Sequence, residues 1–217
     1  MTKSIVKRPY RSPLRQAQAE GTRQRILDAG LRLFAERGYP ATSVAQIAEA
    51  AGVSAETIYS SVGSKRGIID ALLARIDEEG TIETARAAVA ARGGTPRAVL
   101  EVYAETAGHF WAAHADLVEV LRKGVGDPEI GGAWFERESG RRGLFETAVQ
   151  DWPPGTLRSG VDAERAADIA WAITGEETYA RLVERRGWWL DDYIAWMTAL
   201  LIHELLADPE ASPASSL

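Results

Sequence analysis

Cysteine is absent from the 217 residues of the sequence. Its absence excludes disulfide bonds, zinc sites with cysteine ligands and thiol nucleophiles, and it fits a reducing compartment such as the cytoplasm. Long apolar runs are also missing, because no stretch reaches the roughly eighteen apolar residues that a transmembrane helix needs. The basic residues 1–16 lack the apolar stretch of a signal peptide. We therefore expect a cytoplasmic protein without a membrane partner.

Sequence motifs of enzymes are missing as well. The chain contains no Gly-rich phosphate loop, no HExxH and no Gly-x-Ser-x-Gly. His109 and His114 are five residues apart, so they do not share a helical face well, and this spacing disfavours a metal site. We expect no cofactor, no metal and no catalytic activity. An enzyme in an all-helical fold is an alternative that none of these patterns supports.

Positive charge is concentrated near the N-terminus. Residues 1–75 contain 12 Lys/Arg and 6 Asp/Glu, whereas the remainder contains 13 and 25, and the whole chain has a net charge of −6. This asymmetry suggests a basic head that binds a polyanion and an acidic body with another role. The first seventeen residues carry five basic side chains and no acid. They form either a solvated, flexible tail or an arm that lies along DNA.

Apolar residues recur at helical spacing, and strand-like alternation is scarce. A first helix is expected over 18–37, where Gly38 and Pro40 end it. A short helix capped by Thr42 or Ser43 ends near Gly52, and a second short helix begins at the Ser54 cap. Two short helices with a glycine in the turn between them are typical of a helix-turn-helix motif.

The remaining chain is also expected to be helical, so we predict an all-α fold. The expected segments are 80–92, 96–112, 115–123, 128–151, 162–173, 176–186 and 189–207, separated by glycine and proline. The domain organisation that follows is a flexible basic arm over 1–17, a helix-turn-helix domain over 18–66, a helical body over 67–207 and a polar tail over 208–217.

The head resembles the TetR/AcrR family of bacterial transcriptional regulators. The matching residues are Arg25-Ile26-Leu27-Asp28-Ala29, Leu33-Phe34, Gly38-Tyr39, Thr42-Ser43-Val44, Ile47-Ala48, Ala51-Gly52-Val53-Ser54, Thr57-Ile58-Tyr59 and Ser64-Lys65. The resemblance implies a homodimer. In each protomer the second helix of the helix-turn-helix motif enters a major groove, and the two helices occupy successive major grooves of a pseudo-palindromic operator. It also implies a repressor that a small-molecule ligand in the C-terminal body releases from DNA. A helical dimeric ligand-binding or adaptor protein that no longer binds DNA is the alternative.

The resemblance also implies roles for individual residues. Expected phosphate contacts are Thr42, Ser43, Ser54, Tyr59 and Lys65, since helix N-termini, hydroxyls and ammonium groups attract phosphate. The expected base-facing residues are Ala55, Glu56, Thr57 and Ser60. For Thr57 and Ser60 the alternative is that the side chain is exposed to solvent and contacts no base. The expected DNA contacts of the arm are Lys7, Arg8, Arg11 and Arg15.

The sequence departs from the family pattern at two places. Ser60, Ser61 and Val62 stand where the family usually has a residue, then His or Tyr, then Phe, and Arg66-Gly67 follows the lysine in place of an acid. Val62 in place of Phe is expected to loosen the packing between the third and fourth helices. Ser61 in place of a ring is expected to remove a contact with the DNA backbone.

The body contains all seven tryptophans. Residues expected to line the ligand pocket are His109, Trp111, Trp134, Trp171 and Glu176, although core or interface tryptophans, a solvated histidine and a helix-terminal acid are the simpler interpretations. Homodimerisation is expected through the helices over 162–186 and 189–207, because the last helix has a broad apolar face. An intramolecular partner for that face is the alternative.

Overall fold

The computed structural model describes residues 13–79 and 82–208, and almost all of its regular structure is helical. Within these ranges the only extended pairing is an isolated antiparallel bridge between Leu157 and Leu206. The prediction of an all-α fold is confirmed. The chain divides into two compact units, Met1–Arg75 and Ile76–Leu217, and the division falls inside a helix.

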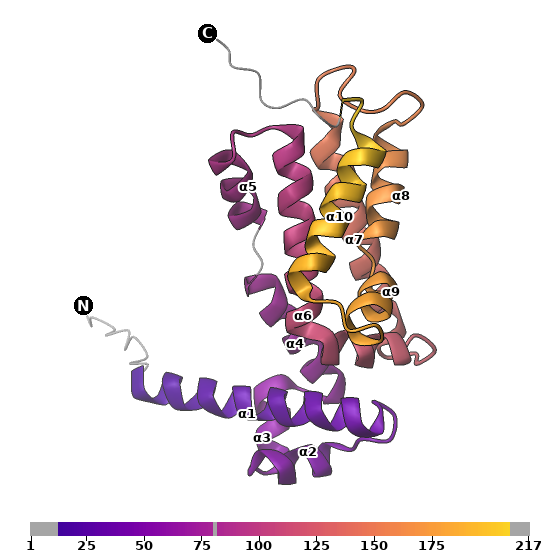
Figure 1. Ribbon diagram of the computed structural model, residues 1–217. Helices are drawn as coiled ribbons and strands as arrows, with labels where there is room; N and C mark the ends of the chain where they lie inside the picture. The colour runs from indigo at the N-terminus through magenta and orange to yellow at the C-terminus, as the bar shows by residue number, and fades with distance from the viewer. Residues whose placement is uncertain (1–12, 80–81, 209–217) are drawn as a thin grey trace, which may run out of the picture. The chain divides into compact units, whose positions relative to one another are not determined.

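The first unit contains four helical segments. They are α1 (Pro13–Arg37), α2 (Val44–Ala51), α3 (Ala55–Val62) and most of α4 (Lys65–Glu79). Both α2 and α3 pack against α1, and a short turn joins them (Figure 1). The fully buried side chains are Ile26, Leu27, Phe34, Ile47, Ile58, Ile68, Ile69 and Leu72. These positions follow the 3.6-residue period, so the apolar face of each helix forms the core of this unit.

The first helix begins earlier than its apolar pattern predicts. It starts at Pro13 rather than Gln18, so residues 13–17 are helical and are not part of a flexible arm. Proline is favoured in the first turn of a helix, because its missing N–H has no partner there and its φ is already helical. The residues from Leu14 to Glu20 are exposed. Because these side chains are exposed, they show no apolar period, and the sequence pattern does not reveal that residues 13–17 are helical.

The second unit contains the remaining helices. They are α5 (Ile82–Ala91), α6 (Pro96–Lys123), α7 (Gly131–Gln150), α8 (Ala163–Ile173), α9 (Glu176–Tyr179), the π-helical segment η1 (Ala180–Glu184) and α10 (Leu190–Leu205). Within this unit α6, α7, α8 and α10 pack along one another, and α5 lies beside α6 (Figure 1). Their shared core includes Trp111, Phe145, Tyr193, Met197 and Leu201.

Two helices of this unit differ from the prediction. The segments over 96–112 and 115–123 are one helix, α6, which is kinked at His114, where φ is −123° and ψ is 19°. The segment over 176–186 is a single α-turn followed by the π-helical η1. Neither site has a proline or glycine at the irregular residue, and so neither irregularity has a local sequence signal.

The packing of α6 against α10 depends on a glycine. A Cβ at Gly108 would lie 2.5 Å from Ile194 Cγ1, so only glycine allows the two helices to approach this closely. Across the part of the chain that the structure describes, no helix is both long and apolar enough to cross a bilayer.

Candidate functional site

The turn between α2 and α3 is held by caps at both helix starts. Ser43 forms a reciprocal capping box with Gln46, and Ser54 Oγ accepts a hydrogen bond from the Thr57 N–H at 3.1 Å. Gly52 ends α2 with φ at 66°, a left-handed conformation that glycine adopts without strain. These local contacts fix the angle at which α3 leaves the turn.

Only one side chain of α3, Ile58, is fully buried. Glu56, Tyr59 and Ser60 are exposed, with Tyr59 at 55% of its surface, whereas Ala55 and Thr57 are half-buried. The Thr57 hydroxyl lies 2.9 Å from Ser54 Oγ, and Ser60 Oγ donates to the Thr57 carbonyl. The structure therefore brings the expected base-facing residues together on one short helix whose outer face is open.

Thr42 lies in a different environment from the one expected. Its side chain is only 2% exposed, and its hydroxyl is 2.9 Å from the Gly38 carbonyl and 3.2 Å from the Leu33 carbonyl. Its backbone N–H donates to the Tyr39 carbonyl. This environment does not favour the expected phosphate contact by Thr42, because the hydroxyl and the N–H are both occupied at the end of α1. Ser43, its neighbour, is exposed.

Lys65 is half-buried and contacts Tyr39. Its Nζ donates to the Tyr39 carbonyl at 3.0 Å and lies 4.1 Å from the centre of the Tyr39 ring. The ammonium group is thereby held at the start of α4 by a hydrogen bond and a cation–π contact. The role of Tyr39 in positioning Lys65 is missed by the sequence, because 26 residues separate the two.

The end of α3 and the start of α4 meet closely. Arg23 of α1 donates to the Ser61 carbonyl at 3.2 Å, and the Gly67 N–H donates to Ser64 Oγ, the cap of α4. A Cβ at Gly67 would overlap the Val62 carbonyl oxygen. Ser61 and Gly67, at the two departures from the family pattern, thus take part in one tight junction. Arg23 is a further residue that sequence patterns do not identify.

Of the expected arm residues, Lys7, Arg8 and Arg11 lie outside the described residues. Arg15 is an exposed residue of α1.

The expected pocket residues of the second unit do not form one group. Trp111 is 2% exposed, and its Nε1 donates to the Thr174 carbonyl at 2.8 Å. Trp134 is half-buried with its ring 6.4 Å from the Trp111 ring, and Trp171 is 41% exposed. His109 is an exposed residue of α6 that lines an open groove with α10. Trp111 and Trp134 are therefore together inside the unit, whereas His109 is on another face of α6.

A half-buried arginine connects the helices around Trp111. Arg141 of α7 donates to Thr174 Oγ1 at 2.7 Å and to Glu138 Oε2 at 3.0 Å, and its guanidinium lies 5.6 Å from the Trp111 ring. Glu138 also accepts a hydrogen bond from Trp171 Nε1 at 2.9 Å. Burial opposes the charge of Arg141, but the neighbouring Tyr103 and Glu138 outweigh it and raise its pKa. Arg141 lies in a charged stretch without a clear period, so the sequence gives no sign of its burial.

Among the described residues, three side chains have a buried polar atom without a hydrogen-bond partner: Arg141 at Nε, Glu176 at Oε2 and Tyr193 at its hydroxyl. Glu176 is 8% exposed, its Oε1 is 3.6 Å from Arg122 Nε, and its Oε2 has no hydrogen-bond partner. Burial raises the pKa of Glu176, and the arginine only partly offsets this. Tyr193 is fully buried with an unpaired hydroxyl, and burial raises its pKa strongly. Unpaired buried polar atoms are rare in folded proteins, and a bound water or ion is one of the explanations for them.

Residues 26–72 match the model of the bacterial regulatory proteins of the tetR family. The HTH-type transcriptional repressor KstR2 of Rhodococcus jostii (strain RHA1) is 31% identical over 169 residues, which cover 70% of this chain and 77% of that protein. The uncharacterized HTH-type transcriptional regulator YvkB of Bacillus subtilis (strain 168) is 44% identical over 54 residues, which cover 25% of this chain and only 29% of YvkB.

The solved structures extend the similarity to the second unit. NalD, described as the secondary repressor of the MexAB-OprM multidrug efflux pump in Pseudomonas aeruginosa, superposes with a TM-score of 0.70 at 20% identity, covering 88% of this chain and 99% of that chain. The fatty acid degradation regulator FadR of Bacillus halodurans superposes with a TM-score of 0.66 at 20% identity, covering 83% and 94%. With the capped helix-turn-helix and the likeness to KstR2 over most of its length, these matches show that the chain belongs to the TetR family of bacterial regulatory proteins.

Proposed function

We propose that the chain is a transcriptional repressor that binds a pseudo-palindromic operator as a homodimer and is released by a small molecule bound in the second unit. The observation that carries this proposal is the outer face of α3, which exposes Glu56, Tyr59 and Ser60 beside the capped α2–α3 turn. KstR2 and NalD, both named as repressors, support the direction of regulation. An adaptor that no longer binds DNA is not favoured, because this face is intact.

Phosphate binding is assigned to the starts of the short helices. The N-terminus of a helix offers free N–H groups and a partial positive charge, and Ser43 and Ser54 are exposed there. The exposed Tyr59 adds a hydroxyl and Lys65 adds a positive charge next to α3. Contacts of this kind place the protein on the duplex but do not read its sequence.

Base recognition is assigned to the four small or acidic residues of α3. The Thr57 hydroxyl is occupied by Ser54, so its methyl group is the part left for a thymine methyl. Glu56 is exposed in the first turn and is able to accept a hydrogen bond from the cytosine N4 amino group. Ala55 is suited to a thymine methyl, and Ser60 to either a donor or an acceptor.

Release by a ligand requires coupling between the two units. Such coupling is typically about 1–3 kcal/mol, and by linkage DNA weakens ligand binding to the same extent. The interior around Trp111 and Trp134, with the unpaired atoms of Glu176 and Tyr193 in the same unit, is the proposed ligand region.

The test is selection of bound DNA from a random pool, followed by gel-shift titration of the selected sequence. The expected result is enrichment of a sequence with twofold symmetry, whose half-sites are separated by about one helical turn, roughly 34–36 Å, or somewhat more. Alanine at Glu56 is expected to relax the preference at one position of each half-site, whereas alanine at Glu136, an exposed acid of α7, is expected to change nothing. A folded protein that enriches no sequence would contradict the proposal and favour the adaptor.

A further inference from the structure

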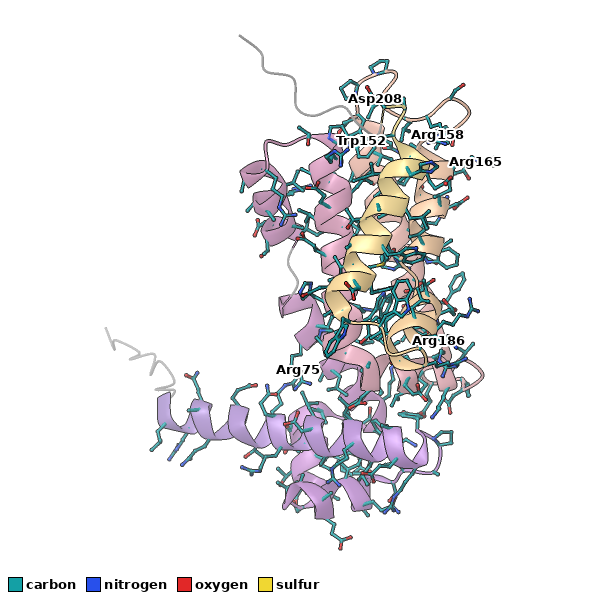
Figure 2. All side chains as sticks on the ribbon, viewed as in Figure 1. Arg75, Trp152, Arg158, Arg165, Arg186 and Asp208 are labelled. Atoms are coloured by element: carbon teal, nitrogen blue, oxygen red, sulfur yellow. The ribbon has the colours of Figure 1, made fainter. Side chains whose placement is uncertain are left out.

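The short helix α9 places an acid inside the second unit. Glu176 is its first residue and Tyr179 its last, and both side chains are buried, each with 8% of its surface exposed. The chain runs directly from α9 into the π-helical η1, which ends two residues before Arg186, labelled in Figure 2. π-Helical turns are uncommon, and many of them lie at functional sites. A buried acid beside such a turn is a candidate for binding a ligand.

The carboxyl group of Glu176 is incompletely satisfied. Arg122 Nε of α6 lies 3.6 Å from Oε1, which is longer than the usual hydrogen-bond distance of about 2.7–3.2 Å. The side chain of Arg122 is 41% exposed and also lies 3.5 Å from Glu119, so its charge is shared between two acids. Oε2 of Glu176 has no hydrogen-bond partner among the described residues. A buried carboxylate with an open oxygen is costly for the fold, and a donor on a bound molecule would remove that cost.

The electrostatic surroundings of Glu176 are negative. Burial is the main cause that raises the pKa of Glu176, and the charges of Glu177, Glu184 and Glu119 raise it further, against the single opposing charge of Arg122. These three acids are therefore close enough to act on the buried carboxyl group. Like charges disfavour a second anion and favour a cation, so the open oxygen is suited to a positively charged donor.

Aromatic residues flank Glu176 in the fold. Tyr179 follows it by three residues, a spacing that places two side chains on one face of a helix, and the Tyr179 ring centre lies 5.7 Å from that of Tyr193. Trp111 donates to the carbonyl of Thr174, two residues before Glu176. The face of an aromatic ring attracts a cation, and its apolar surface packs against apolar groups. These surroundings suit a molecule with a positive head and an apolar body.

We propose that Glu176 binds the ammonium group of a primary or secondary amine with an apolar body. A protonated amine supplies both the positive charge and the N–H donor that Oε2 lacks, whereas a quaternary ammonium ion supplies only the charge. A metal ion does not fit, because among the described residues no group of three or more His, Asp or Glu side chains is arranged to hold one. The proposal rests on the ligand-released repressor of the proposed function, and it names the chemical class of that ligand.

Three probes of similar size test the need for a positive charge. They are phenethylammonium, the uncharged phenethyl alcohol and the anion phenylacetate, and isothermal titration calorimetry of the full chain measures the dissociation constant of each. We expect phenethylammonium to bind roughly tenfold or more tightly than either of the others, a difference of about 1.4 kcal/mol. Equal binding of the amine and the alcohol, or no binding of the amine, would overturn the proposal.

Substitution of the acid tests the position of the site. Glu176→Gln keeps the shape of the side chain but removes its charge, so we expect the preference for the amine over the alcohol to disappear. Glu177→Gln, at the exposed neighbouring acid, is the matched control and is expected to keep most of that preference. If Glu176→Gln binds the amine as the wild type does, Glu176 is not the site.

Gel-shift titration with the selected operator separates this proposal from the repressor function. Saturating phenethylammonium is expected to weaken operator binding by the wild type and to leave that of Glu176→Gln unchanged. If the amine binds through Glu176 and operator binding stays the same, an amine is not the regulatory ligand, and the repressor function stands. If the wild type binds no operator, the repressor function fails, and the calorimetric preference alone decides whether Glu176 is an amine site.

Discussion

Thr42 and Ser43 are adjacent hydroxyl residues with opposite environments. Thr42 is buried and bonds to carbonyls at the end of α1, whereas Ser43 is exposed and caps α2. Sequence resemblance assigns both to phosphate, because both precede the same helix. The structure separates them, since only one of the two hydroxyls is open to solvent.

Thr42→Val tests this difference. The change keeps the shape of the side chain but leaves buried carbonyls of α1 without their hydroxyl donor, so we expect unfolding in urea to show a loss of about 1–3 kcal/mol. The slope of operator affinity against salt concentration is expected to remain that of the wild type. Ser43→Ala is the matched comparison, with an expected loss of about 0.5–2 kcal/mol from the missing cap. A lower salt slope for Thr42→Val would restore its phosphate role.

Lys65→Ala removes a positive charge that Tyr39 holds at the start of α4. We expect weaker binding to all DNA sequences and a salt slope smaller by about 0.9, the value for one phosphate contact. Fluorescence anisotropy at several salt concentrations measures both, with dimerisation unaffected. An unchanged slope in a folded variant would show that Lys65 serves only the packing of Tyr39.

Glu176 makes the stability of the second unit depend on pH. Burial raises its pKa above that in the unfolded chain, so the folded state favours the protonated form. The contribution of this group to the free energy of unfolding is fully present below the ordinary pKa of glutamate, about 4.3. It is lost as the pH rises through the raised pKa of Glu176. Glu176→Gln is therefore expected to have a higher Tm than the wild type at pH 7 and a similar Tm at pH 4. Glu136→Gln, at an exposed site, is the control, and a Tm gain for Glu176→Gln that is equal at both pH values would contradict the assignment.

At the scale of elements, the junction of α3 and α4 decides how the exposed face of α3 is held. Looser packing of the α3 and α4 side chains, because Val62 replaces a ring, stays a prediction. The structure shows the helix ends in close approach, with Arg23 bonded to the Ser61 carbonyl and Gly67 against the Val62 carbonyl. The small residue at position 67 is therefore required by the backbone of α3.

Gly67→Ala is expected to destabilise the first unit by about 1–3 kcal/mol, the usual range for overpacking, and to weaken operator binding by displacing α3. Gly21→Ala is the control, because a Cβ there meets no atom within 4 Å and α1 is expected to gain about 0.5–1 kcal/mol. Chemical denaturation of both variants measures the difference. Equal stability of the two would show that the junction relaxes freely.

At the scale of the whole molecule, the proposed homodimer couples stability to concentration. Partner binding to the folded state only raises apparent stability, by about 1.4 kcal/mol for each tenfold increase in protomer concentration. We expect the Tm of the wild type, measured by calorimetry, to fall over a hundredfold dilution series, because dilution favours dissociation of the dimer. A Tm independent of concentration would indicate a monomer in this range.

The sequence by itself determined the helical class, the helix-turn-helix and the family. The signals that identify them act over three or four residues, so they can be recognised in the sequence alone. They are the caps at Ser43, Ser54 and Ser64, the glycine at 52 and the apolar period. The same local signals placed Ile47 and Ile58 in the core, where the structure has them.

Only the tertiary structure decided which polar groups are buried and which are free. Three features depend on contacts between distant segments or on the turn of the chain around them. They are the hydrogen bonds of the Thr42 hydroxyl, the contact of Lys65 with Tyr39 and the partial burial of Arg141. The kink at His114 and the π-helical η1 likewise follow from packing rather than from proline or glycine. Such features have no period in the sequence, because each is fixed by neighbours that the fold alone brings together.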